Sequence, residues 1–190
     1  MVGNQKKIGV LALQGAVREH IHQIEQLGHI AIPIKRVEQL NDIDGLVLPG
    51  GESTTMRRLL DEYDFTTSLR QSELPMYGTC AGLILLAKSV QDREDYHIGK
   101  LDIHVERNAF GRQIDSFETM LNVTGIDHQV EAIFIRAPII KSVEQHVEVL
   151  STVDDNIVAV KQGKYLGVSF HPELSNDLSM MKYFIEQTID

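Results

Sequence analysis

Short apolar runs alternate with helix-spaced apolar positions along the first half of the chain. The runs are typical of strands buried on both faces, whereas spacings of three and four residues are typical of helices with one buried side. Gly28 is expected to end the first helix, and Pro33 places the second strand near a sheet edge because proline has no N–H for the ladder. The pattern predicts strands at 8–13, 31–34, 44–49 and 75–78, and helices at 17–27, 53–60 and 81–89.

The second half of the chain has a different pattern, of short strands separated by turns. A final helix is expected at 177–188, with Ser175 or Asn176 as its cap. The strands are expected at 101–106, 118–124, 131–136, 147–153, 157–161 and 166–170, and part of them should be antiparallel.

The alternation of strands and helices determines the expected fold class. It indicates a mostly parallel sheet covered on both faces, in which sites gather at the carboxyl ends of the strands. We therefore expect an α/β protein with one domain over residues 1–190. Its architecture should be a three-layer α/β/α sandwich, with a mostly parallel central sheet and added antiparallel strands.

Composition and charge exclude several classes of function. The 190 residues are 43% hydrophobic and 24% charged, as in ordinary globular proteins, and no linker divides them. A net charge of −9 without a basic cluster argues against a nucleic-acid partner. No apolar run approaches the roughly 18 residues that span a bilayer, and residues 1–7 lack the apolar region of a signal peptide. We therefore expect a cytoplasmic protein without a membrane partner.

The only cysteine, Cys80, limits the possible redox and metal chemistry. One cysteine cannot form an internal disulfide or a zinc cluster, which leaves a packing role or a reactive thiol. The eight histidines show no metal-ligand spacing, because His20 and His22 lie two apart on an expected helix and point in different directions. We expect no metal site.

Cys80 lies in the sequence Gly-Thr-Cys-Ala-Gly, at the junction of an expected strand and helix. This is the form of a nucleophile elbow, in which the central residue occupies a strained turn and glycines let helix and strand approach closely. The first turn of the helix adds partial positive charge, which favours a thiolate. A lone cysteine is also commonly a small buried hydrophobe, and this short pattern alone leaves both interpretations open.

The sequence His171-Pro172-Glu173 follows the last expected strand. A cysteine nucleophile needs a base, and the base needs a third group that fixes its tautomer. Two residues apart at a strand end, His171 and Glu173 can project to the same side, so that one ring nitrogen meets the glutamate and the other faces Cys80. A single histidine is more commonly structural, but its coincidence with the elbow favours catalysis.

A Gly50-Gly51 turn follows the third expected strand. Its unobstructed backbone N–H groups are suited to hold the oxyanion of a tetrahedral intermediate together with the N–H of Ala81. The turn could also cradle a phosphate, but the Gly-Lys-Ser/Thr sequence of a P-loop is absent. The same residues indicate a helix start with Ser53 as its cap, and both roles can hold at once.

Together, these three motifs resemble those of the triad-type (class I) glutamine amidotransferases, which have a flavodoxin-like fold. The match is more specific than this class, because residues 9–20, 48–59, 105–113 and 134–138 resemble the glutaminase subunits of pyridoxal 5'-phosphate synthase. Other amidotransferases share the triad but not Gly-Glu-Ser-Thr-Thr-Met-Arg-Arg or Glu-Arg-Asn-x-Phe-Gly-Arg. The resemblance extends from Ile8 to the final helix.

The resemblance implies hydrolysis of L-glutamine to glutamate and ammonia. It implies Cys80 as nucleophile, His171 as base and Glu173 as the orienting carboxylate. Free glutamine has an ammonium and a carboxylate group, so its site needs opposite charges or oriented dipoles. The implied glutamine-binding residues are Gly51, Glu52, Ser53, Arg107, Ile135 and Arg136, and those of the oxyanion hole are Gly50, Gly51 and Ala81. No cofactor is implied, because pyridoxal 5'-phosphate is the product of the complex.

The resemblance also implies a partner, a (β/α)8-barrel synthase subunit in a large hetero-oligomer that makes the cofactor from a pentose phosphate and a triose phosphate. Docking is expected to activate the glutaminase, with Gln14 and Gly15 transmitting the contact to the Gly50-Gly51 peptide. Two alternatives stay open. The chain could serve another synthase, such as one making imidazole glycerol phosphate, or it could be a noncatalytic regulatory or scaffold subunit.

Overall fold

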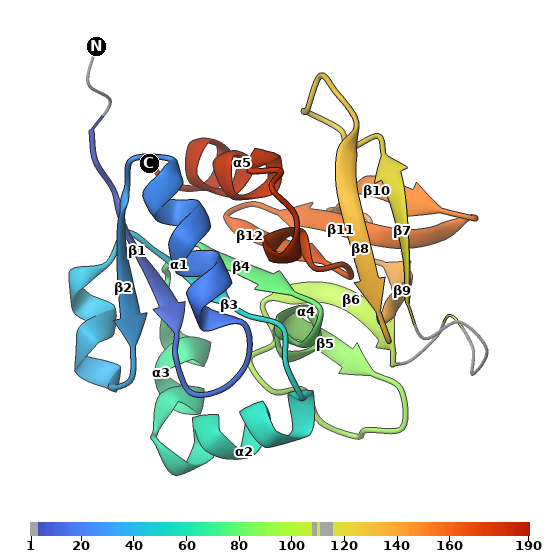
Figure 1. The fold of residues 1–190 in the computed structure, drawn as a ribbon. Helices are drawn as coiled ribbons and strands as arrows, with labels where there is room; N and C mark the ends of the chain where they lie inside the picture. Colours follow the sequence, from blue (N-terminus) through green and yellow to red (C-terminus); the bar gives the residue numbers. More distant parts are fainter. Residues whose placement is uncertain (1–3, 108–109, 111–115) are drawn as a thin grey trace.

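A ten-stranded sheet forms the centre of the molecule (Figure 1). The computed structural model describes residues 4–107, 110 and 116–190. Half of the sheet has the order β2-β1-β3-β4-β12 and is entirely parallel, so the carboxyl ends of these strands meet at one edge. The bounds are β1 Lys7–Leu11, β2 Ile30–Ile34, β3 Gly45–Leu48, β4 Met76–Thr79 and β12 Tyr165–Val168.

Helices cover both faces of these parallel strands (Figure 1). Successive residues of one strand face opposite layers: Leu46 and Leu48 belong to one hydrophobic core, and Val47 belongs to the other. The first core includes η1 (Val37–Asp42), α2 (Ser53–Glu62), α3 (Phe65–Gln71) and α4 (Ala81–Leu86), and the second includes α1 (Val17–Gln26) and α5 (Ser179–Thr188). The expected three-layer architecture is confirmed.

The other half of the sheet contains antiparallel pairs, as expected. β11 (Asn156–Gln162) pairs with β12 and with β9 (Ile139–Val143), and the order continues through β6 (Leu101–Glu106) to β5 (Ala87–Val90). β10 (Glu148–Val153) pairs with β11. β7 (Ser116–Leu121) and β8 (Val130–Ile135) form a separate two-stranded sheet, in which β8 contacts the 3-10 helix η2 (Pro172–Leu174).

Two local predictions about the first half of the chain are confirmed. Gly28 follows the end of α1 with a φ of 82°, a left-handed conformation that favours glycine. Pro33 lies in β2, which is an edge strand. No helix in the described part of the chain has the length and apolar character needed to cross a membrane.

Several element boundaries differ from the prediction. The first strand ends at Leu11, and α3 and β9 were not expected. The two apolar residues of α3 are too few for a clear helical pattern, and the apolar residues of β9 do not alternate strictly with polar ones. The helix expected at 81–89 ends at Leu86, because residues 87–90 pair with β6, a contact that local periodicity cannot predict. Ser175 and Asn176 do not cap α5. Its first N–H, that of Ser179, instead donates to Asp177 Oδ1 at 2.9 Å.

Candidate active site

Cys80 occupies a tight turn between β4 and α4. Its φ of 49° and ψ of −103° are strained for a residue with a side chain. A Cβ atom on Gly78 would lie 2.5 Å from the backbone of Gly82, and one on Gly82 would lie 2.0 Å from the carbonyl oxygen of Leu48. Both glycines are therefore required by the close approach of strand and helix, and Cys80 is 8% exposed at the carboxyl edge of the sheet.

His171 reaches Cys80 because β12 is the neighbour of β4. Val168 is in register with Thr79, and the Cys80 N–H donates to the Val168 carbonyl at 2.9 Å. The chain then turns at η2, where the His171 Nδ1 and Glu173 Oε1 atoms lie 2.7 Å apart. The predicted projection of these two side chains to one side is thus realised in the structure.

The electrostatics of this pair favour opposite charges. Burial lowers the pKa of His171, but hydrogen bonds to the Cys80 side chain and to Glu173 outweigh burial and raise that pKa to about 10. Burial raises the pKa of Glu173, yet the hydrogen bond from His171 outweighs burial and holds that pKa below its usual value. The geometry therefore supports an imidazolium next to a carboxylate at neutral pH.

The Gly50-Gly51 turn packs directly against the side chains of His171 and Cys80. A Cβ atom on Gly50 would lie 2.5 Å from the His171 ring and 3.5 Å from the Cys80 Cβ atom. The other side of the turn contacts the loop after β1, where Ala16 N–H donates to the Gly50 carbonyl at 3.1 Å. A Cβ atom on Gly15 would lie 2.0 Å from that carbonyl oxygen, so this contact requires glycine, which has a φ of 97° there.

A cavity of about 440 Å³ opens in front of Cys80. All six residues that the resemblance implies in glutamine binding line it, together with Cys80, Ala81, His171 and a residue not predicted, Ile84. Ile84 lies one helical turn after Cys80, and its N–H donates to the Cys80 carbonyl at 3.3 Å. That spacing of four residues could have indicated it. Gln14, Gly15, Gly50 and Glu173 are not among the lining residues.

Glu52 lines the cavity and also caps the start of α2. Its carboxylate accepts hydrogen bonds from Thr54 N–H at 3.0 Å and from Thr55 N–H at 2.7 Å. The Thr55 side-chain hydrogen bond and these backbone bonds lower the pKa of Glu52 to about 2. Glu52 is therefore the N-cap of α2, and the prediction of Ser53 as the cap is wrong. Ser53 is the first helical residue, and the longer glutamate side chain folds back over the helix start.

Part of the cavity lining comes from the ends of β6 and β8. Arg107 follows β6, and Ile135 and Arg136 lie at the end of β8, where Arg136 has a φ of 43°. Phe110 packs against Phe134 of β8 with ring centroids 5.5 Å apart. Residues 108–109 and 111–113 of the sequence motif at 105–113 lie outside the described residues.

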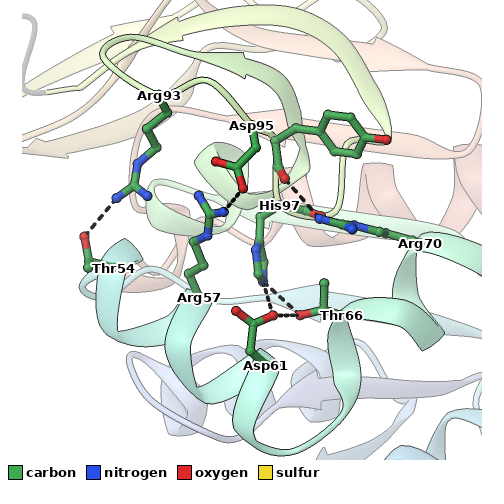
Figure 2. Close-up of polar contacts among 9 residues, drawn as sticks. Thr54, Arg57, Asp61, Thr66, Arg70, Arg93, Asp95 and His97 are labelled. Carbon is green, nitrogen blue, oxygen red and sulfur yellow. Dashed lines mark hydrogen bonds and ion pairs between the residues drawn. The ribbon is translucent and has the colours of Figure 1, made fainter.

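A polar cluster holds α2, which begins at the cavity, from its outer side (Figure 2). Arg57 pairs with Asp95 of the loop after β5, and Arg93 of the same loop donates to Thr54 Oγ1 at 3.3 Å. His97 is 4% exposed, and its Nε2 lies 3.1 Å from Thr66 Oγ1 and 3.9 Å from Asp61 Oδ1. Burial lowers the pKa of His97 to about 4, so this histidine is neutral at physiological pH.

Among residues 4–107, 110 and 116–190, no three His, Cys, Asp or Glu side chains are placed to hold an ion together. The expectation that the chain needs no metal or cofactor stays a prediction.

Comparisons with known proteins agree with this geometry. A family model described as the SNO glutamine amidotransferase family matches residues 10–190. The pyridoxal 5'-phosphate synthase subunit PdxT of Staphylococcus haemolyticus (strain JCSC1435) is 64% identical over 183 residues, covering 96% of this chain and 99% of that protein. The subunit of the same name from Staphylococcus aureus (strain Newman) is 59% identical over 183 residues, covering 96% and 98%.

Solved structures are also similar to this chain. A crystal structure of a glutamine amidotransferase has a TM-score of 0.90 at 44% identity and covers 95% of this chain and 98% of its own. The structure of PurLQS from Thermotoga maritima has a TM-score of 0.68 at 15% identity with 95% and 98% coverage, a likeness of fold alone. The family match over residues 10–190 and the nearly full-length relatives confirm the resemblance seen in the sequence. The chain belongs to the SNO glutamine amidotransferase family.

Proposed function

We propose that this chain hydrolyses L-glutamine to L-glutamate and ammonia through a Cys80-His171-Glu173 triad. The observation that carries the proposal is the convergence of three separate strand ends on one cavity. Cys80 follows β4, the Gly50-Gly51 turn follows β3, and His171 lies just beyond β12. A scaffold subunit would need neither the strained elbow nor the pairing of His171 with the buried Glu173 carboxylate, which argues against a noncatalytic role.

The reaction begins when the Cys80 thiolate forms a bond to the side-chain amide carbon of glutamine. The electron pair of the carbonyl bond moves to oxygen, which gives a tetrahedral oxyanion. His171 donates its proton to the amide nitrogen as the carbon–nitrogen bond breaks, and ammonia leaves a glutamyl thioester. The now neutral His171 takes a proton from water, whose oxygen attacks the thioester carbon. The carbon–sulfur bond breaks, glutamate leaves and the thiolate is restored.

The oxyanion is held by backbone N–H groups of Gly51 and Ala81. In a trans peptide, the N–H and C=O groups point in opposite directions. Because the Gly50 carbonyl accepts from Ala16, the Gly51 N–H points away from the loop after β1. Glu52 N–H donates to the Gln14 side-chain oxygen at 3.1 Å, which fixes the other end of the turn. Gln14 and Gly15 therefore hold the oxyanion peptide in one orientation.

The charged residues of the cavity recognise the two ends of free glutamine. Arg107 and Arg136 line the cavity and suit the substrate carboxylate by their charge, and Glu52, which also lines it, suits the ammonium. The carboxylate of Glu52 already accepts from Thr54 and Thr55, so its charge is fixed in position before substrate arrives.

Ammonia from this site passes to a synthase subunit. Relatives 59–64% identical to this chain are named as subunits of pyridoxal 5'-phosphate synthase, which supports that enzyme as the recipient. The partner is a (β/α)8-barrel subunit in a cytoplasmic hetero-oligomer, and its docking on the loop at Gln14 and Gly15 activates the glutaminase.

Glutaminase assays with and without the synthase test the proposal. The wild-type chain should release glutamate and ammonia from glutamine, with a higher rate in the complex, and the complex should form pyridoxal 5'-phosphate. Cys80→Ala should abolish both activities. Hydrolysis that persists in Cys80→Ala would contradict the triad, and product formation only with another synthase, such as one making imidazole glycerol phosphate, would contradict the assigned partner.

Gln14→Ala tests the coupling role separately. The variant should hydrolyse glutamine slowly without the synthase, and the synthase should stimulate it less than it stimulates the wild type. The reason is that the Glu52 N–H, next to the oxyanion peptide, loses its hydrogen bond to the Gln14 side-chain oxygen. Unchanged stimulation would remove Gln14 from the coupling path.

A further inference from the structure

His20 is a fully buried histidine that the proposed reaction does not use. It lies on α1 with 0% exposure, on the side of the sheet opposite α2 and α4. Its Nε2 atom lies 3.2 Å from Thr79 Oγ1, the residue before Cys80, and 3.8 Å from Glu173 Oε2. The ring of Tyr77 lies edge-on to it at 6.5 Å between centroids, which restricts its orientation. His20 therefore lies next to Glu173 and next to Thr79, the residue that precedes Cys80.

The carboxylate of Glu173 needs a second partner. The side chain is buried, its Oε1 contacts His171, and its Oε2 has no hydrogen-bond partner among the described residues. A buried carboxylate oxygen without a donor is costly, and the cost is lowest when a positive dipole end points at it. The Nε2 of His20 is the ring atom placed to supply that dipole, at 3.8 Å.

The surroundings of His20 favour the tautomer that has its proton on Nε2. Burial lowers the pKa of His20, so the ring is neutral and has one N–H. The Nδ1 atom is buried without a partner, whereas Nε2 faces both the Thr79 hydroxyl and the carboxylate. A proton on Nε2 directs the positive end of the N–H toward Glu173, and a proton on Nδ1 would direct a lone pair there.

We infer that His20 is a positioning residue, which holds the Glu173 carboxylate through its Nε2–H so that Glu173 keeps His171 correctly oriented for proton transfer. The inference rests on the proposed function, because it assigns His20 a task only if Glu173 belongs to the triad. His20 contacts neither the cavity nor the thiol in this arrangement, so its effect should appear in the chemical step rather than in the binding of glutamine.

Three substitutions in the complete complex with the synthase test this assignment. His20→Gln places an amide N–H near the position of Nε2, His20→Asn places one near Nδ1, and His20→Leu provides none at similar volume. An unpaired buried group costs about 1–3 kcal/mol, which corresponds to a loss of kcat of about 5- to 150-fold for the asparagine and leucine variants. His20→Gln should keep about a third or more of the wild-type kcat, and the KM for glutamine should stay within about twofold in all three.

Thermal unfolding of each variant separates positioning from folding. If His20→Leu does not fold, the comparison of His20→Gln with His20→Asn decides, because both variants keep a polar side chain at this position. Equal kcat for these two variants, or a loss that appears only in KM, would overturn the inference. The wild type and Cys80→Ala are assayed alongside. An inactive wild type or an active Cys80→Ala would instead refute the proposed function, whereas wild-type kcat in all folded His20 variants refutes the role of His20 alone.

Discussion

Two histidines, the partly buried His171 and the buried His97, each lie next to a carboxylate but behave in opposite ways. His171 contacts the buried Glu173 at 2.7 Å and the side chain of Cys80, and its pKa is raised to about 10. His97 lies 3.9 Å from the exposed Asp61, and burial lowers its pKa to about 4, with further lowering by two nearby arginines. One is poised to donate a proton at neutral pH, and the other is a neutral packing residue.

The difference shows which surroundings raise the pKa of a histidine and which lower it. Burial acts on both rings in the same direction, because it disfavours the charged form. Only a direct hydrogen bond to an ionised partner that is itself shielded from water overcomes this effect. The partner of His97 is exposed and farther away, so its attraction is weak and the Thr66 hydroxyl becomes the main contact.

The largest expected effect on activity comes from Glu173, the carboxylate of the proposed triad. Glu173→Gln should lower kcat by about 10³-fold or more, because a neutral amide cannot stabilise the imidazolium or fix its tautomer. The matched change at the other histidine, Asp61→Asn, should leave kcat within about twofold of wild type. Steady-state glutaminase kinetics of both variants in the complex measure this. Similar losses in both would remove the distinction between the two histidines.

The Cys80 side chain contributes to the raised pKa of His171, so removal of the thiol should lower that pKa. In Cys80→Ala, the pKa of His171 should fall clearly below 10, whereas that of His97 should not change. Titration of both rings by NMR provides the measurement. A His171 pKa that does not respond to the substitution would mean that Glu173 alone sets it.

The two histidines should also affect stability in opposite pH ranges. His97 has a lowered pKa, so its contribution is present above pH 6.5 and is lost as the pH falls toward 4, because the unfolded chain then binds a proton that the folded chain does not. The raised pKa of His171 gives a contribution that is present below pH 6.5 and lost as the pH rises through 10.

Chemical unfolding between pH 4 and 7 tests the His97 part of this expectation. The unfolding free energy of the wild type should fall by about 2 kcal/mol more than that of His97→Gln over this range. Parallel pH profiles for the two proteins would show that His97 does not resist protonation in the folded state.

The smallest expected effect concerns the exposed carboxylate of Glu52. Its pKa is lowered to about 2 by hydrogen bonds at the start of α2, so its contribution is present above pH 4.5 and lost as the pH falls to 2. Solvent screening limits the loss in Glu52→Gln to about 1 kcal/mol at pH 7, and the two proteins should converge at pH 2. A difference that persists at pH 2 would mean that charge is not the cause.

The parts of the site that the sequence predicted are local in the chain. The elbow at Cys80 needs only its two neighbouring glycines, and His171 and Glu173 are two residues apart, so short motifs carry both. The parallel sheet follows from alternating apolar patterns, and it brings these motifs to one edge. Their positions could therefore be derived from residue patterns before the fold was known.

Other parts of the site depend on contacts between distant segments. Arg107 and Arg136 come from separate sheets, and only the resemblance to a family indicated them. His20 approaches Glu173 because α1 packs against η2, a contact across 153 positions that no local pattern shows. The cap of α2 was missed for another reason, since Glu52 folds its longer side chain onto the helix start in place of Ser53.

Covalent labelling tests most directly the claim that Cys80 is the nucleophile of a glutaminase. The chain in complex with the synthase would be mixed with the glutamine analogue diazo-oxo-norleucine and examined by intact-protein and peptide mass spectrometry. We predict one adduct, located on Cys80, and none in Cys80→Ala. Labelling at another residue, or no labelling of the wild-type complex, would contradict the account.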